Sequence, residues 1–143
     1  MNPPFHLREI DHLVLRVRDL PRMLGFYCEV LGCTLERTQA EIGLTQLRAG
    51  RSLIDLVDVD SKLGRMGGAA PGAEGRNLDH LCLRVEPFDA AAIRAHLSAA
   101  GTDPGEVESR YGAEGQGPSI YLWDPEGNTV ELKGPPWPSA AGT

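Results

Sequence analysis

The sequence predicts an α+β domain that contains two copies of a βαβββ module. Two observations carry this prediction: a strand pattern of eight residues occurs twice, and each copy precedes one helical pattern and three short strand patterns. The chain has 143 residues, which is the length of one ordinary domain. We therefore interpret residues 1–143 as a single domain with an internal duplication.

The duplicated strand contains a histidine. Residues 10–17 (IDHLVLRV) return as residues 78–85 (LDHLCLRV), with identical residues at six of the eight positions. The histidines of the two copies, His12 and His80, are 68 residues apart. Apolar residues alternate with other residues in both copies, which is the pattern of a strand with one buried face.

Each copy of this strand is followed by the pattern of an amphipathic helix. The first helix begins at Asp19, a capping residue, and ends before Gly32, with apolar residues at intervals of three and four. The second helix begins near Pro87 and Asp89 and ends at Gly101. Both helices therefore have an apolar face that can cover a sheet.

Three strands are expected after each helix, separated by turn residues. They are residues 34–38, 44–49 and 52–59 in the first copy and residues 106–109, 119–123 and 129–133 in the second. Residues 124–127 (DPEG) have the residue order of a type I turn. These elements complete the βαβββ order in both copies.

The remaining segments are a connector and a tail. The first module spans residues 8–60 and the second spans residues 78–133. The glycine-rich residues 61–77 between them are either a flexible linker or a lid over a site. The proline-rich residues 134–143 cannot form a central strand, and we expect them to run over the surface.

Composition excludes several classes of function. The net charge is -6 with only two lysines, which argues against binding to a nucleic-acid backbone. No apolar run approaches the roughly 18 residues of a membrane span, and the first residues do not resemble a signal peptide. Three cysteines, an odd number, suit a reducing compartment. We expect a soluble cytoplasmic protein that binds neither nucleic acid nor membrane.

Strand alternation places four ionisable side chains on the sheet faces opposite the helices. His12 and His80 occupy equivalent positions in the duplicated strand, and Asp55 and Glu131 each lie between two apolar residues in the last strand of a module. A carboxylate in the centre of a strand is costly to bury without a partner. Imidazole and carboxylate groups together suit one divalent ion of Zn, Ni, Mn, Co or Fe(II).

A structural interpretation of the same residues stays open at this point. A single strand histidine is more often a hydrogen-bonded structural residue than a metal ligand, and the acids can pair instead with Arg16 or Arg84, which share these faces. The duplication favours the metal site because four coincidences become one symmetric arrangement. His6 and His96 are expected at the surface, and Cys82 is expected to line a pocket without a base that would activate it.

These residues resemble the vicinal oxygen chelate superfamily, which includes glyoxalase I, extradiol dioxygenases, fosfomycin-modifying thiol transferases and bleomycin resistance proteins. The resemblance covers about residues 8–133 and rests on the two histidine strands, on the end of the first helix and on the closing strand pair. The matching residues are Phe26, Tyr27, Val30, Leu31 and Gly32 of the helix and residues 121–128 (YLWDPEGN) with Glu131.

The resemblance implies that the modules form a curled mixed sheet around a central cavity with a divalent metal. It implies metal ligands at His12, His80 and Glu131, with Asp55 where the glyoxalase arrangement commonly has glutamate. Because aspartate is one methylene shorter, Asp55 reaches the metal less readily, and it can instead act through water, serve as a base or orient a neighbour. Four ligands indicate a glyoxalase-like lyase, whereas three leave open positions as in Fe(II) dioxygenases.

The implied function is that of a metal-dependent enzyme acting on a small molecule with adjacent oxygens. The metal would act as a Lewis acid that stabilises an oxyanion, with Glu131, Asp55 and Tyr121 as catalytic residues. Tyr121 can instead form an aromatic wall of the pocket. Arg16, Arg84 and Trp123 are the candidate substrate-binding residues.

Two alternatives to an enzyme remain. One is a metal-free protein of the bleomycin resistance type that sequesters a ligand, and the other is a scaffold with a vestigial site. Lyase, dioxygenase and thiol transferase chemistry are not separated by any local motif in the sequence. Homodimers are usual for such proteins, either side by side or with modules exchanged between chains.

Overall fold

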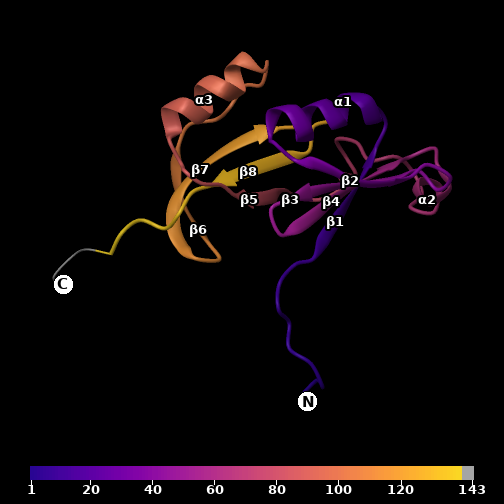
Figure 1. The fold of residues 1–143 in the computed structure, drawn as a ribbon, viewed down its shortest axis with the longest axis horizontal. Helices are drawn as coiled ribbons and strands as arrows, with labels where there is room; N and C mark the ends of the chain where they lie inside the picture. The colour runs from indigo at the N-terminus through magenta and orange to yellow at the C-terminus, as the bar shows by residue number, and fades with distance from the viewer. Residues whose placement is uncertain (140–143) are drawn as a thin grey trace. The chain divides into compact units, whose positions relative to one another are not determined.

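A computed structural model describes residues 1–139 of the chain, and its elements follow the predicted order. The elements are β1 (His12–Val17), α1 (Leu20–Leu24), η1 (Gly25–Val30), β2 (Thr34–Gln39), β3 (Leu44–Ala49), β4 (Ser52–Asp58), α2 (Lys62–Arg65), β5 (Leu81–Arg84), α3 (Ala90–Ala99), β6 (Glu108–Gly112), β7 (Gly115–Trp123) and β8 (Thr129–Lys133). Figure 1 shows these elements along the chain. The α+β class with two βαβββ modules is therefore confirmed.

The strands form two four-stranded mixed sheets, each within one compact unit of the chain. The first unit covers residues 1–71 and has strand order β1-β4-β3-β2, and the second begins at residue 72 and has order β5-β8-β7-β6. In both sheets the first strand of the module runs parallel to the last, and the other pairs are antiparallel. The backbone ladder within each sheet is open rather than closed into a barrel.

The strand registers show that the two sheets are built alike. In the first sheet Val14 of β1 pairs with Asp55 of β4, and in the second Cys82 of β5 pairs with Glu131 of β8. Val14 and Cys82 occupy the same position of the duplicated strand, so the two acids are equivalent by register. The sequence predicted this equivalence from the apolar neighbours of the acids.

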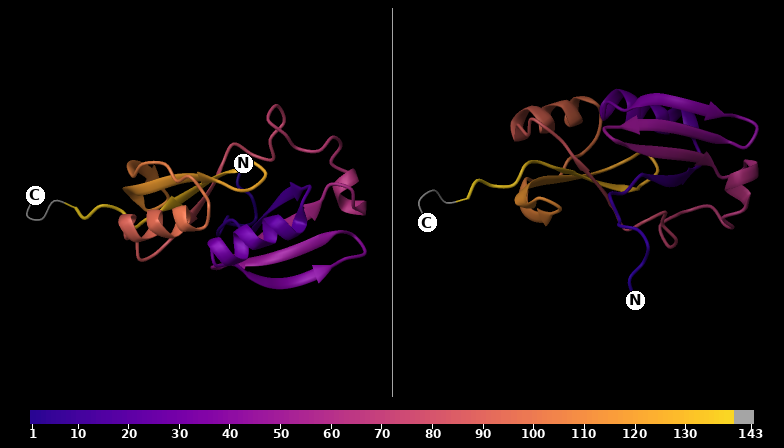
Figure 2. Two further views of the ribbon diagram at one scale, coloured as in Figure 1. Left: turned by 90° about the horizontal axis from the view of Figure 1, so that it is seen from above. Right: turned by 60° about the horizontal axis from the view of Figure 1, so that its bottom comes forward.

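The first helix differs from the regular helix that the sequence predicts. Asp19 caps α1 by accepting a hydrogen bond from the Arg22 amide, but after five residues the chain continues as the π-helical segment η1. In this wider turn two consecutive aromatic residues face inward. Phe26 and Tyr27 are both buried, and their rings pack edge to face. Figure 2 shows α1 beside the strands of its own unit.

The second unit repeats this plan with a regular helix and a tight hairpin. Asp89 caps α3 by accepting from the Ala92 amide, and the helix buries Leu97. Between β7 and β8 the carboxylate of Asp124 accepts hydrogen bonds from two backbone amides, and Gly127 has a φ of 83° that suits glycine. This turn fixes the position of β8, which carries Glu131.

The first half of the predicted connector is attached to the first unit. The guanidinium of Arg16 donates hydrogen bonds to the carbonyl oxygens of Gly64, Gly68 and Ala69 at 3.2, 3.0 and 2.9 Å. The segment also contains α2, which could not be predicted because the segment lacks a periodic apolar pattern. Among the helices of residues 1–139, none has the length and apolar character needed to cross a membrane.

The first residues of the tail lie along the second sheet. The Trp137 amide donates to the Gln116 carbonyl at 2.7 Å, and the indole N–H donates to the Ser109 hydroxyl at 2.8 Å. The ring is half exposed, so it is held mainly by hydrogen bonds. The end of the predicted tail, residues 140–143, lies outside the described residues.

Candidate functional site

In the second unit, His80 and Glu131 lie together on the face of the sheet opposite α3. The Nε2 atom of His80 lies 3.4 Å from the Oε1 atom of Glu131, and Glu131 is only 5% exposed. Alternation along β5 and β8 places both side chains on one face, while Val130 and Leu132 point into the core. The structure thus brings together the predicted histidine and carboxylate of this module.

The other nitrogen of the His80 ring is occupied by its neighbour in the sequence. The Nδ1 atom lies 2.6 Å from a carboxylate oxygen of Asp79. Because a carboxylate only accepts hydrogen bonds, this contact requires the proton on Nδ1. The Nε2 atom therefore lies on the side of the ring that faces Glu131, and two lone-pair donors that face each other can hold a cation between them.

Tyr121 completes this corner of the site. It is the cross-strand partner of Glu131, and its ring packs edge to face against His80 with ring centroids 5.7 Å apart. The guanidinium of Arg110 lies 4.1 Å from the centre of the Tyr121 ring. Partial burial, with the nearby Glu131 charge and a hydrogen bond to Glu131, raises the pKa of Tyr121. Its hydroxyl therefore stays protonated at neutral pH and can donate a hydrogen bond.

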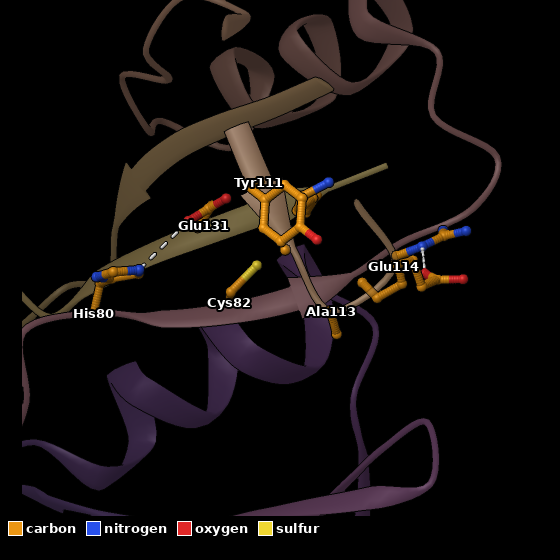
Figure 3. Close-up of a pocket in the computed structure, with 9 residues that line it drawn as sticks. His80, Cys82, Tyr111, Ala113, Glu114 and Glu131 are labelled. Atoms are coloured by element: carbon orange, nitrogen blue, oxygen red, sulfur yellow. Dashed lines mark hydrogen bonds and ion pairs between the residues drawn. The ribbon is translucent and has the colours of Figure 1, made fainter. Parts of the chain in front are cut away.

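A pocket of about 270 Å³ opens beside His80 and Glu131, and all of its lining residues belong to the second unit (Figure 3). The predicted lining residue Cys82 lies in this pocket. Partial burial of the sulfur, followed by the charge of Glu131, raises the pKa of the Cys82 thiol to about 11. Cys82 is therefore a weak nucleophile at neutral pH, as the sequence indicated.

The outer wall of the pocket comes from the end of β6 and the turn that follows it. Tyr111, Ala113 and Glu114 line this side. The Nε atom of Arg84 donates to a carboxylate oxygen of Glu114 at 2.6 Å, and the Nη1 atom of Arg84 donates to a backbone carbonyl. Arg84 thus pairs with Glu114, whereas pairing with the strand carboxylate was one of the alternatives left open by the sequence.

The first unit contains the equivalent histidine, held in the same way. The Nδ1 atom of His12 lies 2.7 Å from a carboxylate oxygen of Asp11. The hydrogen bond to Asp11 raises the pKa of His12, with smaller contributions from the charges of Asp55 and Asp11. The Nε2 atom is again the one available to a ligand, because Asp11 occupies Nδ1.

The carboxylate of the first unit has a partner that the sequence did not indicate. Asp55 is 3% exposed, and both of its oxygens accept hydrogen bonds of 3.2 Å from the side-chain amide of Gln46. Gln46 is its cross-strand partner, so it occupies the position that Tyr121 has beside Glu131. The shared register was the available sequence signal, but the bidentate contact needed side-chain geometry.

The other predicted site residues have identifiable surroundings. Arg16 donates to three connector carbonyls, as described above, and Trp123 is 50% exposed on the same strand as Tyr121. His6 and His96 are exposed, as expected. Lys133 is a residue that the sequence interpretation missed: it lines the pocket and is buried, and its position two residues after Glu131 was the signal that it shares this face.

The histidine and carboxylate of the second unit are spaced as two ligands of one divalent cation would be. Two ligands about 2.1 Å from a metal at a tetrahedral angle lie about 3.4 Å apart, which matches the separation of His80 Nε2 and Glu131 Oε1. Within residues 1–139, no three histidine, cysteine or acidic side chains form a group that could hold a metal ion. Each unit by itself offers one imidazole and one carboxylate, which is half of the predicted ligand set.

Comparison with known proteins gives a family for most of the chain. Residues 9–132 match the model of the Glyoxalase/Bleomycin resistance protein/Dioxygenase superfamily. The chain is 31% identical to virulence protein STM3117 of Salmonella typhimurium over 127 residues, which are 86% of this chain and 81% of that protein. The crystal structure of STM3117 has a TM-score of 0.76 and covers 92% of this chain and 99% of that chain.

Two further solved structures share the fold. An integron cassette protein from the mobile metagenome of V. cholerae is 27% identical with a TM-score of 0.72, covering 91% of this chain and 97% of that chain. TnmS3, an antibiotic-binding protein from Streptomyces sp. CB03234, is 22% identical with a TM-score of 0.68, covering 92% and 98% of the two chains. At this identity the likeness to TnmS3 concerns the fold alone.

Proposed function

The chain belongs to the Glyoxalase/Bleomycin resistance protein/Dioxygenase superfamily, and from this premise we propose that it is a metal-dependent enzyme. Its substrate would be a small molecule that binds the metal through two adjacent oxygens. The observation that carries this proposal is the 3.4 Å approach of His80 Nε2 to Glu131 Oε1, with Nδ1 held by Asp79. This arrangement leaves two lone-pair donors directed at one point.

The proposed ligands are His12, His80 and Glu131, with Asp55 as a fourth or supporting residue. A bound Zn, Ni, Mn, Co or Fe(II) ion would supply Lewis acidity for a developing oxyanion. The contact of the Gln46 amide with both oxygens of Asp55 favours a role for Asp55 beside the metal rather than on it, because metal binding would compete with two existing hydrogen bonds. Three ligands would leave positions for both substrate oxygens.

The surrounding residues can then bind the substrate and move its protons. The protonated hydroxyl of Tyr121 can donate a hydrogen bond to a substrate oxygen beside Glu131, and Glu131 or Asp55 can accept a proton. Trp123 offers an exposed aromatic surface on the same strand. Arg84 can contribute to binding of an anionic group, although it already pairs with Glu114, and the three carbonyl acceptors of Arg16 favour a structural role.

Metal titration of chelator-treated protein tests this proposal. We expect at least one of the five ions to bind, His80→Ala to lose tight binding, and His6→Ala, which removes an exposed histidine, to bind as the original chain does. Absence of binding by all five ions would refute the metal-dependent function. Assays with methylglyoxal plus glutathione and with catechols then separate lyase from dioxygenase chemistry.

A ligand-sequestering protein is the second candidate, and the likeness to the antibiotic-binding TnmS3 fold favours it. In that case an aromatic ligand would bind equally well with and without a chelator, and His80→Ala would leave its affinity unchanged. The enzyme proposal predicts the opposite, because its ligand binds through the metal. One pair of titrations therefore separates the two candidates.

We also propose that the protein acts as a homodimer in the cytoplasm. The homodimer follows the usual assembly of the family, and the compartment follows from the free thiols of Cys28, Cys33 and Cys82. Sedimentation equilibrium tests the dimer, with a single monomeric species as the contrary result. Fractionation of cells that express the chain tests its location.

A further inference from the structure

Lys133 has a largely buried side chain whose ammonium has no carboxylate at ion-pair distance in the described structure. The residue lies at the end of β8, is 5% exposed and lines the pocket that contains His80 and Glu131. Within residues 1–139, its ammonium group forms neither a hydrogen bond nor an ion pair with a carboxylate. Among the described residues, Arg94 Nε is the one buried side-chain polar atom without a partner, so the Lys133 ammonium keeps access to the pocket although most of its side chain is buried.

The other charged groups on this face already have partners. Arg84 pairs with Glu114 at 2.6 Å, Arg110 pairs with Glu108 at 2.8 Å, and His80 faces Glu131 at 3.4 Å. The two arginines are each matched with one carboxylate, whereas the His80 ring lies beside Glu131. Among the described lysine and arginine side chains of this pocket face, Lys133 has no carboxylate at ion-pair distance, so its charge can attract an anion into the pocket.

The neighbouring strands leave space for the Lys133 side chain. A Cβ atom on Gly112 of β6 would lie 2.7 Å from Lys133 Cε, and one on Gly117 of β7 would lie 2.9 Å from Nζ. Larger residues at either position would displace the lysine. The side chain thus crosses two strands through a passage that exists because both positions are glycine.

The first module shows that the fold itself does not require a lysine here. Lys133 pairs with Arg84 in the second sheet, and the register partner of the equivalent Arg16 in the first sheet is Val57. Val57 is 4% exposed, so a buried apolar residue fills this position in the other copy. Lys133 therefore differs in type from its equivalent in the first module, and it lies on the sheet face that lines the pocket.

We propose that Lys133 binds an anionic group of the substrate, a carboxylate or a phosphate, while the adjacent oxygens of the same molecule occupy the metal. The position of the adjacent oxygens on the metal rests on the proposed function, whereas the contact of the anionic group with Lys133 does not. Glu131 and Lys133 are two residues apart on one strand face, so their side chains begin about 6.6 Å apart. The substrate would therefore carry its charge about one aromatic ring away from its metal-binding oxygens.

The experiment compares 3,4-dihydroxybenzoate with catechol, which lacks the carboxylate, by calorimetric titration of the zinc-loaded protein. We expect the carboxylate to improve affinity about tenfold or more, because hydrogen bonds to charged groups are the strong ones. Lys133→Met should remove this preference and leave the affinity for catechol unchanged. Lys62→Met removes the other lysine, which is exposed on α2, and should keep the preference.

A metal-free arm separates failure of this inference from failure of the proposed function. Benzoate and benzyl alcohol are titrated into chelator-treated protein by NMR, and a preference for benzoate that disappears in Lys133→Met supports anion binding whether or not the metal proposal holds. Competition by acetate or by inorganic phosphate then identifies the preferred anion. An unchanged preference in Lys133→Met and in Lys133→Gln, with folding checked by circular dichroism, overturns the inference.

Discussion

The two modules share one backbone plan but hold their carboxylates differently. In the second, Glu131 faces His80 Nε2 at 3.4 Å, whereas in the first both oxygens of Asp55 accept hydrogen bonds from Gln46. The acids are equivalent by strand register, and both are buried. The difference shows that register places the Cα atom, while side-chain length and the cross-strand neighbour decide what each carboxylate contacts.

A second contrast lies two residues further along the last strand of each module, on the same face as the acid. Val57 in the first module and Lys133 in the second occupy equivalent positions, and both are buried. The first sheet therefore ends in an apolar contact and the second in a charged pocket wall. The two copies keep the same strand register, and we propose that the residues that differ between them decide which copy binds the polar part of a ligand.

The largest effect is expected from removing the carboxylates one at a time. Glu131→Gln should weaken metal affinity by more than about 100-fold, because it removes a proposed ligand, whereas Asp55→Asn should weaken it by about tenfold or less. Competition with a chromogenic chelator measures both affinities. Equal losses of affinity would mean that Asp55 and Glu131 contribute equally to metal binding.

Replacing Val57 or Lys133 by the residue that the other module has at this position should change stability in opposite directions. Val57→Lys should lower the free energy of unfolding by about 3 kcal/mol, because it buries a charge beside Arg16, and Lys133→Val should raise it by about 1 kcal/mol. Urea denaturation measures both values. Leu35→Lys, at a position that is 61% exposed, is the control and should change stability by less than about 0.5 kcal/mol. Destabilisation by Lys133→Val would show that the lysine is structural.

The aspartates beside the histidines should affect metal binding in both modules. Asp79→Asn and Asp11→Asn should each weaken metal affinity by about tenfold, since such carboxylates orient the imidazole and raise its basicity. Calorimetric titration with zinc measures this effect. Asp103→Asn removes an exposed acid elsewhere in the second unit and should have no effect. A loss confined to one variant would show that only one histidine binds the metal.

The smallest effect is expected in the titration of His12 in metal-free protein. The hydrogen bond to Asp11 raises its pKa above 6.5, so Asp11→Asn should lower the NMR titration midpoint towards 6.5. A raised pKa stabilises the folded chain fully below the unfolded-state pKa, and this contribution is lost as the pH rises through the folded-state pKa. The side chain is 48% exposed, so the influence on overall stability should be slight. A midpoint unaffected by the substitution would contradict the role of Asp11.

Much of the fold and part of the site could be predicted from the sequence. The repeated strands, the capped helices and the DPEG turn are local patterns, and the structure contains all of them. The pairing of His80 with Glu131 followed from alternation along two strands. The regular first helix was wrong in its second half, because burial of both Phe26 and Tyr27 favours the wider turn of η1.

The sequence by itself determined the duplication, the strand faces and the ligand types, since each of these depends on spacing along the chain. Only the tertiary structure decided that Gln46 holds Asp55, that Arg16 holds the connector and that Lys133 is buried beside two glycines. These contacts join residues on different strands or in separate loops. Their energies depend on side-chain distance and burial, and periodicity along one segment contains neither quantity.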